Sequence, residues 1–170
     1  MSPKHRRCDG HSEIELMGSM KTVNGDLIKL AQAGEFDLIV HGCNCFCKMG
    51  AGIALGIKRA FPLAYQADLA TPKGSHEKLG TISHAIVVTD HGQLIVVNAY
   101  TQFDYRGKGV KVDYQALRLA FRAIKDRFGD LRIGFPAIGA GLAGGDWDLI
   151  ASIIEEELEG TDFTFVKYQP

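Results

Sequence analysis

The chain has 170 residues, a mass of 18.5 kDa and a formal net charge of -1 at pH 7, from 19 basic and 20 acidic residues. This length fits one domain with a hydrophobic core, and the near-neutral charge argues against general binding to a nucleic-acid backbone, which usually needs a basic surface. No run approaches the roughly 18 apolar residues of a transmembrane helix, so the sequence predicts no membrane span.

The first 19 residues differ from the rest of the chain, because their apolar residues show no regular spacing. The segment Met17-Gly18-Ser19-Met20 is typical of the junction between an expression tag and a native start. We therefore expect residues 1–19 to be a disordered arm or an expression tag outside the fold. Residues 20–170 contain no internal repeat or interdomain linker and are expected to form one domain.

Strands and helices alternate from residue 20 onward, and local signals mark several of them. Leu38-Ile39-Val40 is an apolar run typical of a strand buried on both faces. Pro62 favours the first turn of a helix, and Asp90-His91-Gly92 favours a hairpin turn. Asp113 is suited to cap a helix with an apolar stripe. The expected elements are strand 20–24, helix 27–33, strand 36–41, helices 53–60 and 62–69, strands 81–88 and 94–100, helix 114–128, strand 131–135, helix 147–158 and strand 163–168.

Two glycine-rich segments each follow a buried strand and lead into a helix. The order of elements predicts a three-layer α/β/α sandwich with a mixed central sheet, and ligands of such sheets bind at the carboxyl ends of strands. The first segment spans residues 41–54 and the second residues 136–147. Glycine lets backbone N–H groups approach a ligand, and a helix N-terminus favours negative charge. We interpret the pair as a clamp for a diphosphate, although either segment alone would fit simple turn chemistry.

Residues 139–144 also match the glycine spacing of dinucleotide-binding sites. That motif belongs to the first strand–helix–strand unit and is followed about 20 residues later by an acidic residue on a second strand. Here one expected strand follows it. We therefore reject a dehydrogenase.

Three cysteines lie close together in the first glycine-rich segment. Cys43, Cys45 and Cys47 alternate within five residues, too close to bridge one another easily. We expect free thiols, a reducing compartment and a cytoplasmic location. In an extended chain His41 and these cysteines would lie in a row, which is poor geometry for a tetrahedral metal site. No metal and no other cofactor is expected.

Three motifs together resemble the macrodomain (Appr-1″-p processing) family: VNGDL at residues 23–27, IVHGCNC at residues 39–45 with MGAGIA at residues 49–54, and PAIGAGL at residues 136–142. The resemblance extends from about residue 20 to the end of the chain, and the order and spacing of the motifs make it specific. His41-Gly42-Cys43-Asn44-Cys45 and Tyr168-Gln169 are most similar to yeast-type ADP-ribose-1″-phosphate phosphatases. Gly144-Gly145-Asp146-Trp147 also resembles the branch that removes ADP-ribose from protein acids or DNA.

The resemblance implies a role for each motif. Asp26 would accept a hydrogen bond from the adenine amino group beside the Leu27 backbone, although it is equally suited to cap the helix that begins there. Asn44 would serve the hydroxyl groups of the distal ribose, or else stabilise its loop. Tyr168 would cover adenine or ribose, or else complete the core. The diphosphate would be held by Gly50, Ala51, Gly52 and Ile53 and by Ile138, Gly139, Ala140, Gly141 and Leu142.

His41 and Asn44 are the catalytic candidates, as groups that would orient water or the leaving group. A histidine can move a proton near neutral pH, but a hydrogen-bonded structural histidine is an equal alternative. Asp146 is better suited to cap a helix than to act as a catalytic carboxylate.

One departure from the family limits the mechanism. De-ADP-ribosylating relatives that use a covalent lysine carry it at a strand end where this chain has Tyr100-Thr101, and their partner aspartate is replaced by Ala143. Both differences argue against a lysyl intermediate.

The leading hypothesis for function is a hydrolase that removes the 1″-phosphate from ADP-ribose 1″-phosphate. The alternatives are a hydrolase that removes ADP-ribose from protein or nucleic acid, and a non-catalytic ADP-ribose reader. The expected partner is ADP-ribose or a derivative of it, with nucleic acid only as an ADP-ribosylated substrate. No membrane partner is expected, and the chain is expected to be a monomer.

Overall fold

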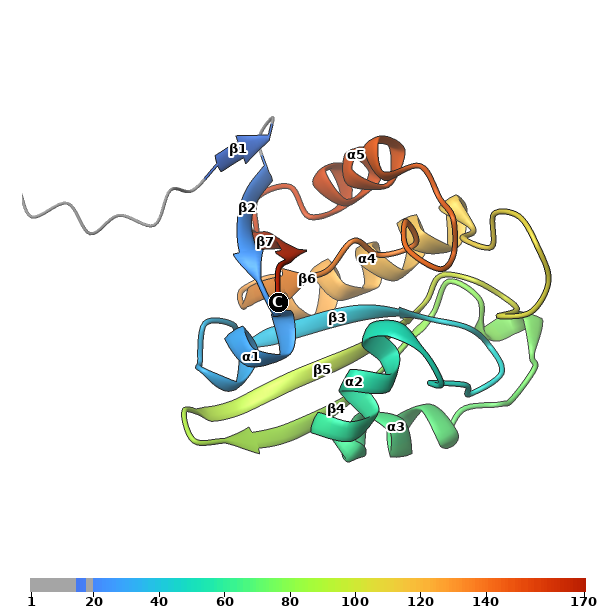
Figure 1. The fold of residues 1–170 in the computed structure, drawn as a ribbon, viewed down its shortest axis with the longest axis horizontal. Helices are drawn as coiled ribbons and strands as arrows, with labels where there is room; N and C mark the ends of the chain where they lie inside the picture. The colour runs from blue at the N-terminus through green and yellow to red at the C-terminus, as the bar shows by residue number, and fades with distance from the viewer. Residues whose placement is uncertain (1–14, 18–19) are drawn as a thin grey trace, which may run out of the picture.

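The computed structural model describes residues 15–17 and 20–170 and shows a three-layer α/β/α sandwich (Figure 1). The strands are β1 (Glu15–Met17), β2 (Met20–Gly25), β3 (Leu38–Cys43), β4 (Ile82–Thr89), β5 (Gly92–Tyr100), β6 (Arg132–Phe135) and β7 (Asp162–Tyr168). The helices are α1 (Leu27–Gln32), α2 (Gly52–Ala60), α3 (Pro62–Leu69), the 3-10 helix η1 (His76–Lys78), α4 (Tyr114–Phe128) and α5 (Trp147–Glu157). Helices α1, α2 and α3 cover one face of the sheet, and α4 and α5 cover the other.

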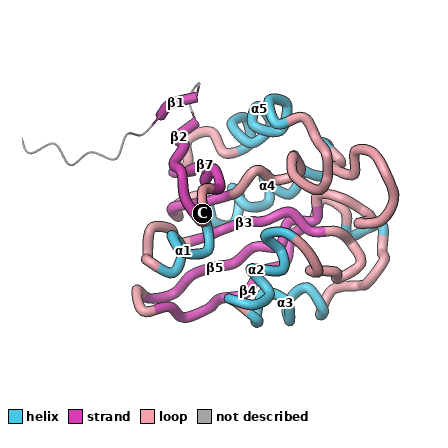
Figure 2. The backbone as a smooth tube through the Cα atoms, in the orientation of Figure 1, coloured by secondary structure: helices cyan, strands magenta, loops and turns pink. Residues whose placement is uncertain are grey.

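Within residues 15–17 and 20–170, the sheet has seven strands in the order β1-β2-β7-β6-β3-β5-β4. The five inner strands are parallel, whereas β1 and β4 pair antiparallel at the two edges. The sheet is therefore mixed, as expected. Because the inner strands are parallel, their carboxyl ends meet at one edge, and the long connections after β3 and β5 lie on the same side of the molecule (Figure 2). That edge is where a ligand site is expected.

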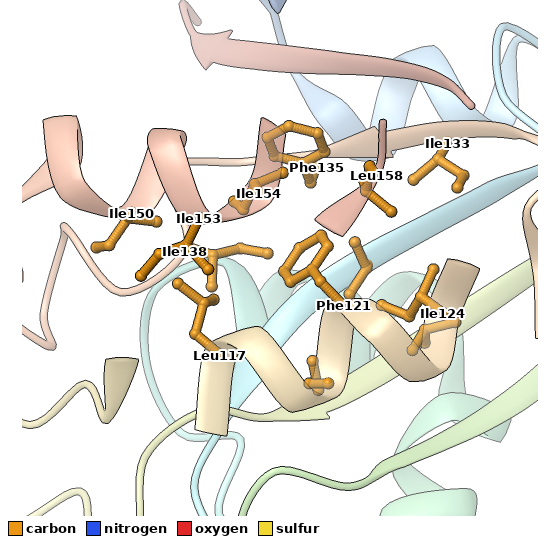
Figure 3. Packing of buried hydrophobic residues seen from close by; sticks show 14 of the residues in the cluster. Leu117, Phe121, Ile124, Ile133, Phe135, Ile138, Ile150, Ile153, Ile154 and Leu158 are labelled. Atoms are coloured by element: carbon orange, nitrogen blue, oxygen red, sulfur yellow. The ribbon is translucent and has the colours of Figure 1, made fainter. Parts of the chain in front are cut away.

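Alternating side chains of the central strands supply two hydrophobic cores, one on each face of the sheet. In β3, Leu38 packs toward α4 and α5, whereas Ile39 packs toward α1, α2 and α3. In β5, Val97 and Val96 divide in the same way. This alternation is the period of a strand buried on both faces. The core beneath α4 and α5 includes Leu117, Phe121, Ile124, Ile133, Phe135, Ile138, Ile150, Ile153, Ile154 and Leu158 (Figure 3).

Aspartate side chains cap the N-termini of three helices. Asp26, Asp113 and Asp146 each accept a hydrogen bond from a backbone N–H of the first turn, at 2.9–3.1 Å. The expected caps at Asp113 and Asp146 are thereby confirmed. Near the end of α5, Glu157 accepts hydrogen bonds at 3.0 Å from Arg118 and from Arg122 of α4. Glu157 therefore joins the two helices.

The end of β3 differs from the sequence-based expectation in a way that affects the site. The expected strand ended at His41, but the parallel ladder with β5 continues to the pair Cys43↔Tyr100. His41 therefore lies inside the strand, because hydrogen bonding to β5 holds two further residues extended.

The expected domain boundary falls at residue 20. Residues 15–17, expected outside the fold, pair with β2, while residues 1–14 and 18–19 lie outside the described residues. Within the described ranges, no helix is long and apolar enough to cross a membrane.

Candidate ligand-binding cleft

A cleft of about 500 Å³ opens at the edge of the sheet where β3, β5 and β6 end. Its walls come from the first glycine loop, residues 44–51, and the second glycine loop, residues 136–146. The structure thus brings together two segments that are about 90 residues apart in the sequence, as expected for parallel strands whose carboxyl ends share one edge. The residues that line the cleft are 42–44, 48, 50–54, 101, 102, 105, 111, 136–139 and 141–143.

The N-terminus of α2 faces this cleft without a side-chain cap. Its N-cap residue is Ala51, and no side chain accepts a hydrogen bond from the first turn. Gly52, Ile53 and Ala54 line the cleft, so the N–H groups that a cap would satisfy lie beside it. Helices α1, α4 and α5 instead begin with a capping aspartate. A helix N-terminus with free N–H groups is suited to bind an anion such as a phosphate.

Two positions in the glycine loops require glycine. Gly52 lies where the first loop approaches the second, and Gly139 lies where the second loop approaches the hydrophobic core. Gly52 has a φ of 58°, and a Cβ there would lie 3.4 Å from Cδ1 of Leu142 in the opposite loop. Gly139 has a φ of 74°, and a Cβ there would lie 2.7 Å from Cγ2 of Val112. Both values of φ fall in the left-handed region that favours glycine. The two loops are therefore packed closely, and their backbone forms much of the cleft wall.

Two lysines bring positive charge to the cleft. Lys48 belongs to the first glycine loop, and Lys111 lies on the segment between β5 and α4. The backbone N–H of Lys111 donates to the carbonyl of Ala143 at 2.8 Å, which ties this segment to the second glycine loop. Cations beside an uncapped helix N-terminus add to its attraction for a negatively charged ligand.

Asn44 lines the cleft, but its amide is engaged by its own loop. Its Nδ2 donates to the carbonyl of Lys48 at 2.8 Å, and its Oδ1 accepts from the backbone N–H of Phe46 at 2.9 Å. This is the loop-stabilising arrangement that was the alternative to a ribose contact. Asn44 therefore shapes the first glycine loop.

His41 does not line the cleft. Its side chain is 0% exposed, and its Nε2 lies 2.7 Å from Oδ1 of Asn98, on the side of the sheet covered by α3. Burial lowers the pKa of His41 to about 4, although the hydrogen bond with Asn98 and the charge of Asp68 oppose the shift. The imidazole is thus held neutral away from the cleft, which is the structural-histidine alternative. The expectation of a catalytic His41 assumed that the strand ended there, and the longer β3 removes that assumption.

Asp26, Leu27 and Tyr168 lie at the far end of the same edge of the sheet. Gly25 and Tyr168 are paired in the parallel ladder of β2 and β7. Asp26, which follows Gly25, therefore lies near the end of β7. Tyr168 is 72% exposed, and Leu27 is buried in the core. Asp26 caps α1 through Oδ1 alone, which leaves Oδ2 free of that role. None of the three residues lines the cleft itself. Asp26 and Tyr168 therefore lie on a surface that is adjacent to the glycine loops along the sheet edge but distinct from the cleft.

All but one of the residues expected to hold a diphosphate line the cleft. Gly50 to Ile53 of the first glycine loop and Ile138, Gly139, Gly141 and Leu142 of the second line the cleft, whereas Ala140 does not. Cys43, Cys45 and Cys47 are free thiols. In the described part of the chain, no three His, Cys, Asp or Glu side chains converge as metal ligands would.

Five polar residues that line the cleft were not expected from the sequence: Lys48 of the first glycine loop, and a separate group of Thr101, Gln102, Tyr105 and Lys111. The last four belong to the segment between β5 and α4, where the sequence has no periodic pattern that would predict a helix or strand. An isolated bridge between Gln102 and Val112 folds this segment back beside the cleft. The one sequence signal for these residues as ligand-binding candidates is that their segment follows a parallel strand, at whose carboxyl end ligands bind.

The family is decided by comparison with known proteins, since the model of the Macro domain family matches residues 40–154. The chain belongs to this family. Both glycine loops of the macrodomain lie within the matched residues. The match confirms the family that the three sequence motifs indicated.

Relatives with similar sequences cover most of this macrodomain. The uncharacterized 17.5 kDa protein in the tk-vs intergenic region of Enterobacteria phage T4 is 33% identical over 157 residues, which is 89% of this chain and 97% of the phage protein. ADP-ribose glycohydrolase OARD1 of Bos taurus is 30% identical over 149 residues, which is 86% of this chain and 88% of that protein.

Solved structures share the fold at lower identity. The macrodomain of Mycobacterium tuberculosis DarG matches with a TM-score of 0.65 at 22% identity, over 90% of this chain and 99% of that chain. Thermosipho africanus DarTG in complex with ADP-ribose matches with a TM-score of 0.67 at 17% identity, over 94% of this chain and 43% of that chain.

Proposed function

We propose that this macrodomain binds ADP-ribose and hydrolyses a bond at the distal ribose, with removal of the 1″-phosphate from ADP-ribose 1″-phosphate as the first candidate reaction. The observation that carries the binding proposal is the uncapped N-terminus of α2 between two glycine loops. A diphosphate would accept hydrogen bonds from its free N–H groups. A similar structure, that of Thermosipho africanus DarTG, is a complex with ADP-ribose.

The far end of the sheet edge would hold the adenosine half of the ligand. Oδ2 of Asp26 is not used by the helix cap and would accept a hydrogen bond from the adenine amino group. Tyr168 is exposed beside it and offers a ring for stacking. This placement sets the distal ribose on the side of Asn44, Gln102 and Tyr105.

The charge of the cleft favours the phosphatase reaction. A phosphate monoester carries a charge of about -1.5 to -2 near neutral pH, in addition to the charge of the diphosphate. Lys48 and Lys111 would stabilise that additional charge. We do not assign proton transfer to His41, because it is buried away from the cleft with a pKa lowered to about 4.

A second candidate, removal of ADP-ribose from a macromolecule, is favoured by the similarity to the glycohydrolase OARD1. The replacement of the covalent lysine and its partner, by Tyr100-Thr101 and Ala143, argues for a mechanism without a lysyl intermediate.

Product analysis distinguishes the candidates. The protein is incubated separately with ADP-ribose 1″-phosphate, ADP-ribosylated protein and ADP-ribosylated DNA, and released phosphate and ADP-ribose are measured by colorimetry and nucleotide chromatography. Phosphate release from the first substrate supports the phosphatase, and ADP-ribose release from either conjugate supports the second candidate. Calorimetric binding of ADP-ribose without turnover would identify a reader, and no binding at millimolar ADP-ribose would refute the whole proposal.

A further inference from the structure

A buried polar cluster lies beneath the first glycine loop and outside the cleft lining. Lys78 is 5% exposed and Asp68 is 1% exposed, and the Nζ of Lys78 donates to Oδ1 of Asp68 at 3.3 Å. The same Nζ donates to the Sγ of Cys47 at 3.3 Å and lies 4.3 Å from the centre of the Tyr100 ring. The amine of Lys78 thus contacts both a thiol and a carboxylate in a largely buried site.

Cys47 is held in an unusual backbone conformation. Among the described residues it is the one residue other than glycine with a positive φ, 54°. Its thiol also contacts the carbonyl of Asp68 at 3.2 Å. Such a conformation persists only where surrounding contacts fix it, so the contacts of the thiol help to hold the first glycine loop in place. The Cys47 side chain retains 7% exposure, and the next residue in the chain, Lys48, is exposed, so Cys47 lies close to the protein surface.

We propose that Cys47 and Lys78 form an oxidation site, at which hydrogen peroxide produces a covalent sulfur–nitrogen bond between the two side chains. In the first step the sulfur attacks peroxide: an S–O bond forms, the O–O bond breaks and sulfur is oxidised by two electrons, while the departing hydroxide takes the thiol proton and leaves as water. The product is the sulfenic acid of Cys47.

In the second step the ammonium group of Lys78 transfers a proton to the carboxylate of Asp68. Oδ2 of Asp68 is buried and has no hydrogen-bond partner among the described residues, so it can take this proton. The neutral amine then attacks the sulfur: the S–N bond forms and the S–O bond breaks. The departing hydroxide takes one proton from the nitrogen and leaves as water.

The other described cysteines are less suited to this reaction. Burial raises the pKa of Cys43 well above its usual value and that of Cys45 to about 11. Because the thiolate is the form that reacts with peroxide, both stay unreactive near neutral pH. Sγ of Cys43 contacts the neutral imidazole of His41, and Sγ of Cys45 contacts the carbonyl of Gln102. Cys47 alone among the three is in hydrogen-bond contact with an amine.

The link would alter the cleft, because Cys47 lies between Asn44 and Lys48 in the first glycine loop. Bringing sulfur and nitrogen from contact distance to bonding distance pulls this loop toward η1. We expect ADP-ribose affinity to fall by about tenfold; this consequence rests on the proposed binding function, whereas the bond itself does not.

The test treats the full chain with a small molar excess of hydrogen peroxide, quenches with catalase and compares intact masses. A loss of two hydrogen atoms is expected, together with a proteolytic fragment that joins Cys47 to Lys78. Dithiothreitol should restore the original mass. Cys47→Ser and Lys78→Arg should each abolish the mass loss, while the matched control Cys45→Ser should retain it. Circular dichroism checks that each variant is folded.

Each result has a defined meaning. A mass loss that persists in folded Lys78→Arg indicates a disulfide and overturns the proposal, and so does oxidation of Cys47 to the sulfinic acid without a link. Because Cys47→Ser keeps both charged partners, it provides a second variant if Lys78→Arg does not fold. Calorimetry is run in parallel: unchanged affinity of the linked protein overturns the effect on the cleft. Absence of ADP-ribose binding by untreated protein refutes the proposed function and leaves the mass result intact.

Discussion

Nε2 of His41 lies 2.7 Å from Oδ1 of Asn98, and both side chains are completely buried between the sheet and α3. The amide nitrogen of Asn98 donates to the carbonyl of Ala64 at 2.9 Å, so its oxygen is the atom that faces the imidazole. An acceptor oxygen requires that Nε2 carries the proton of a neutral ring. The pair therefore joins β3 to β5 and α3 while the imidazole stays uncharged.

Folding stability should depend on pH through His41. Its pKa is 6.5 when unfolded and about 4 when folded, mainly because of burial. Between these two pKa values the unfolded state binds more protons than the folded state. The contribution of the neutral, buried His41 to the free energy of unfolding is therefore complete above pH 6.5 and is lost as the pH falls toward 4. The expected decrease is about 3 kcal/mol. Urea denaturation at a series of pH values measures it, and His41→Gln should lose this dependence. An unchanged pH profile in the variant would show that another group is responsible.

Replacing Asp26 should separate its two roles. Asp26→Ser retains a capping oxygen but is too short to reach adenine, whereas Asp26→Ala loses both functions. The alanine variant should be less stable by about 1 kcal/mol, and the serine variant close to wild type. Both should bind ADP-ribose about tenfold more weakly. Thermal unfolding and calorimetry measure these effects; normal affinity of the serine variant would restrict Asp26 to helix capping.

A negative side chain at Gly141 should abolish ligand binding without unfolding the protein. No atom lies within 4 Å of a Cβ built at Gly141, so a longer side chain fits. The carboxylate of Gly141→Glu would then face the diphosphate, and we expect affinity for ADP-ribose to fall by about 100-fold or more. Gly141→Gln is the matched control, since it has the same size without the charge. If glutamate and glutamine weaken binding equally, steric exclusion and not charge is the cause.

The two cleft lysines should contribute through charge. Lys48→Gln and Lys111→Gln should each weaken binding of ADP-ribose 1″-phosphate by about fivefold, with a smaller effect on ADP-ribose itself. The wild-type preference for the phosphorylated ligand should decrease as salt is added, because added ions screen exposed charges. Calorimetry with both ligands measures the difference. Lys125→Gln on the exposed side of α4 is the control, and an equal effect there would mean that only net charge matters.

The sequence predicted most elements because their signals are local. Helices α3 and α4 begin where Pro62 and Asp113 suggested, since a proline ring and a capping carboxylate act within one helical turn. The three layers followed from the apolar run of β3 and the alternation of strands and helices. The two glycine loops were also predicted as one site, because parallel strands place their carboxyl ends together.

Tertiary structure decided which side chains of those segments face the cleft. His41 was placed at the cleft by sequence, but two additional residues of pairing with β5 keep it inside the strand, and its partner Asn98 is 57 residues away. Lys111 and Gln102 reach the cleft from a segment without periodicity. Local spacing determines the type of an element, whereas strand register and long-range hydrogen bonds determine which way each side chain points, because those depend on partners distant in the sequence.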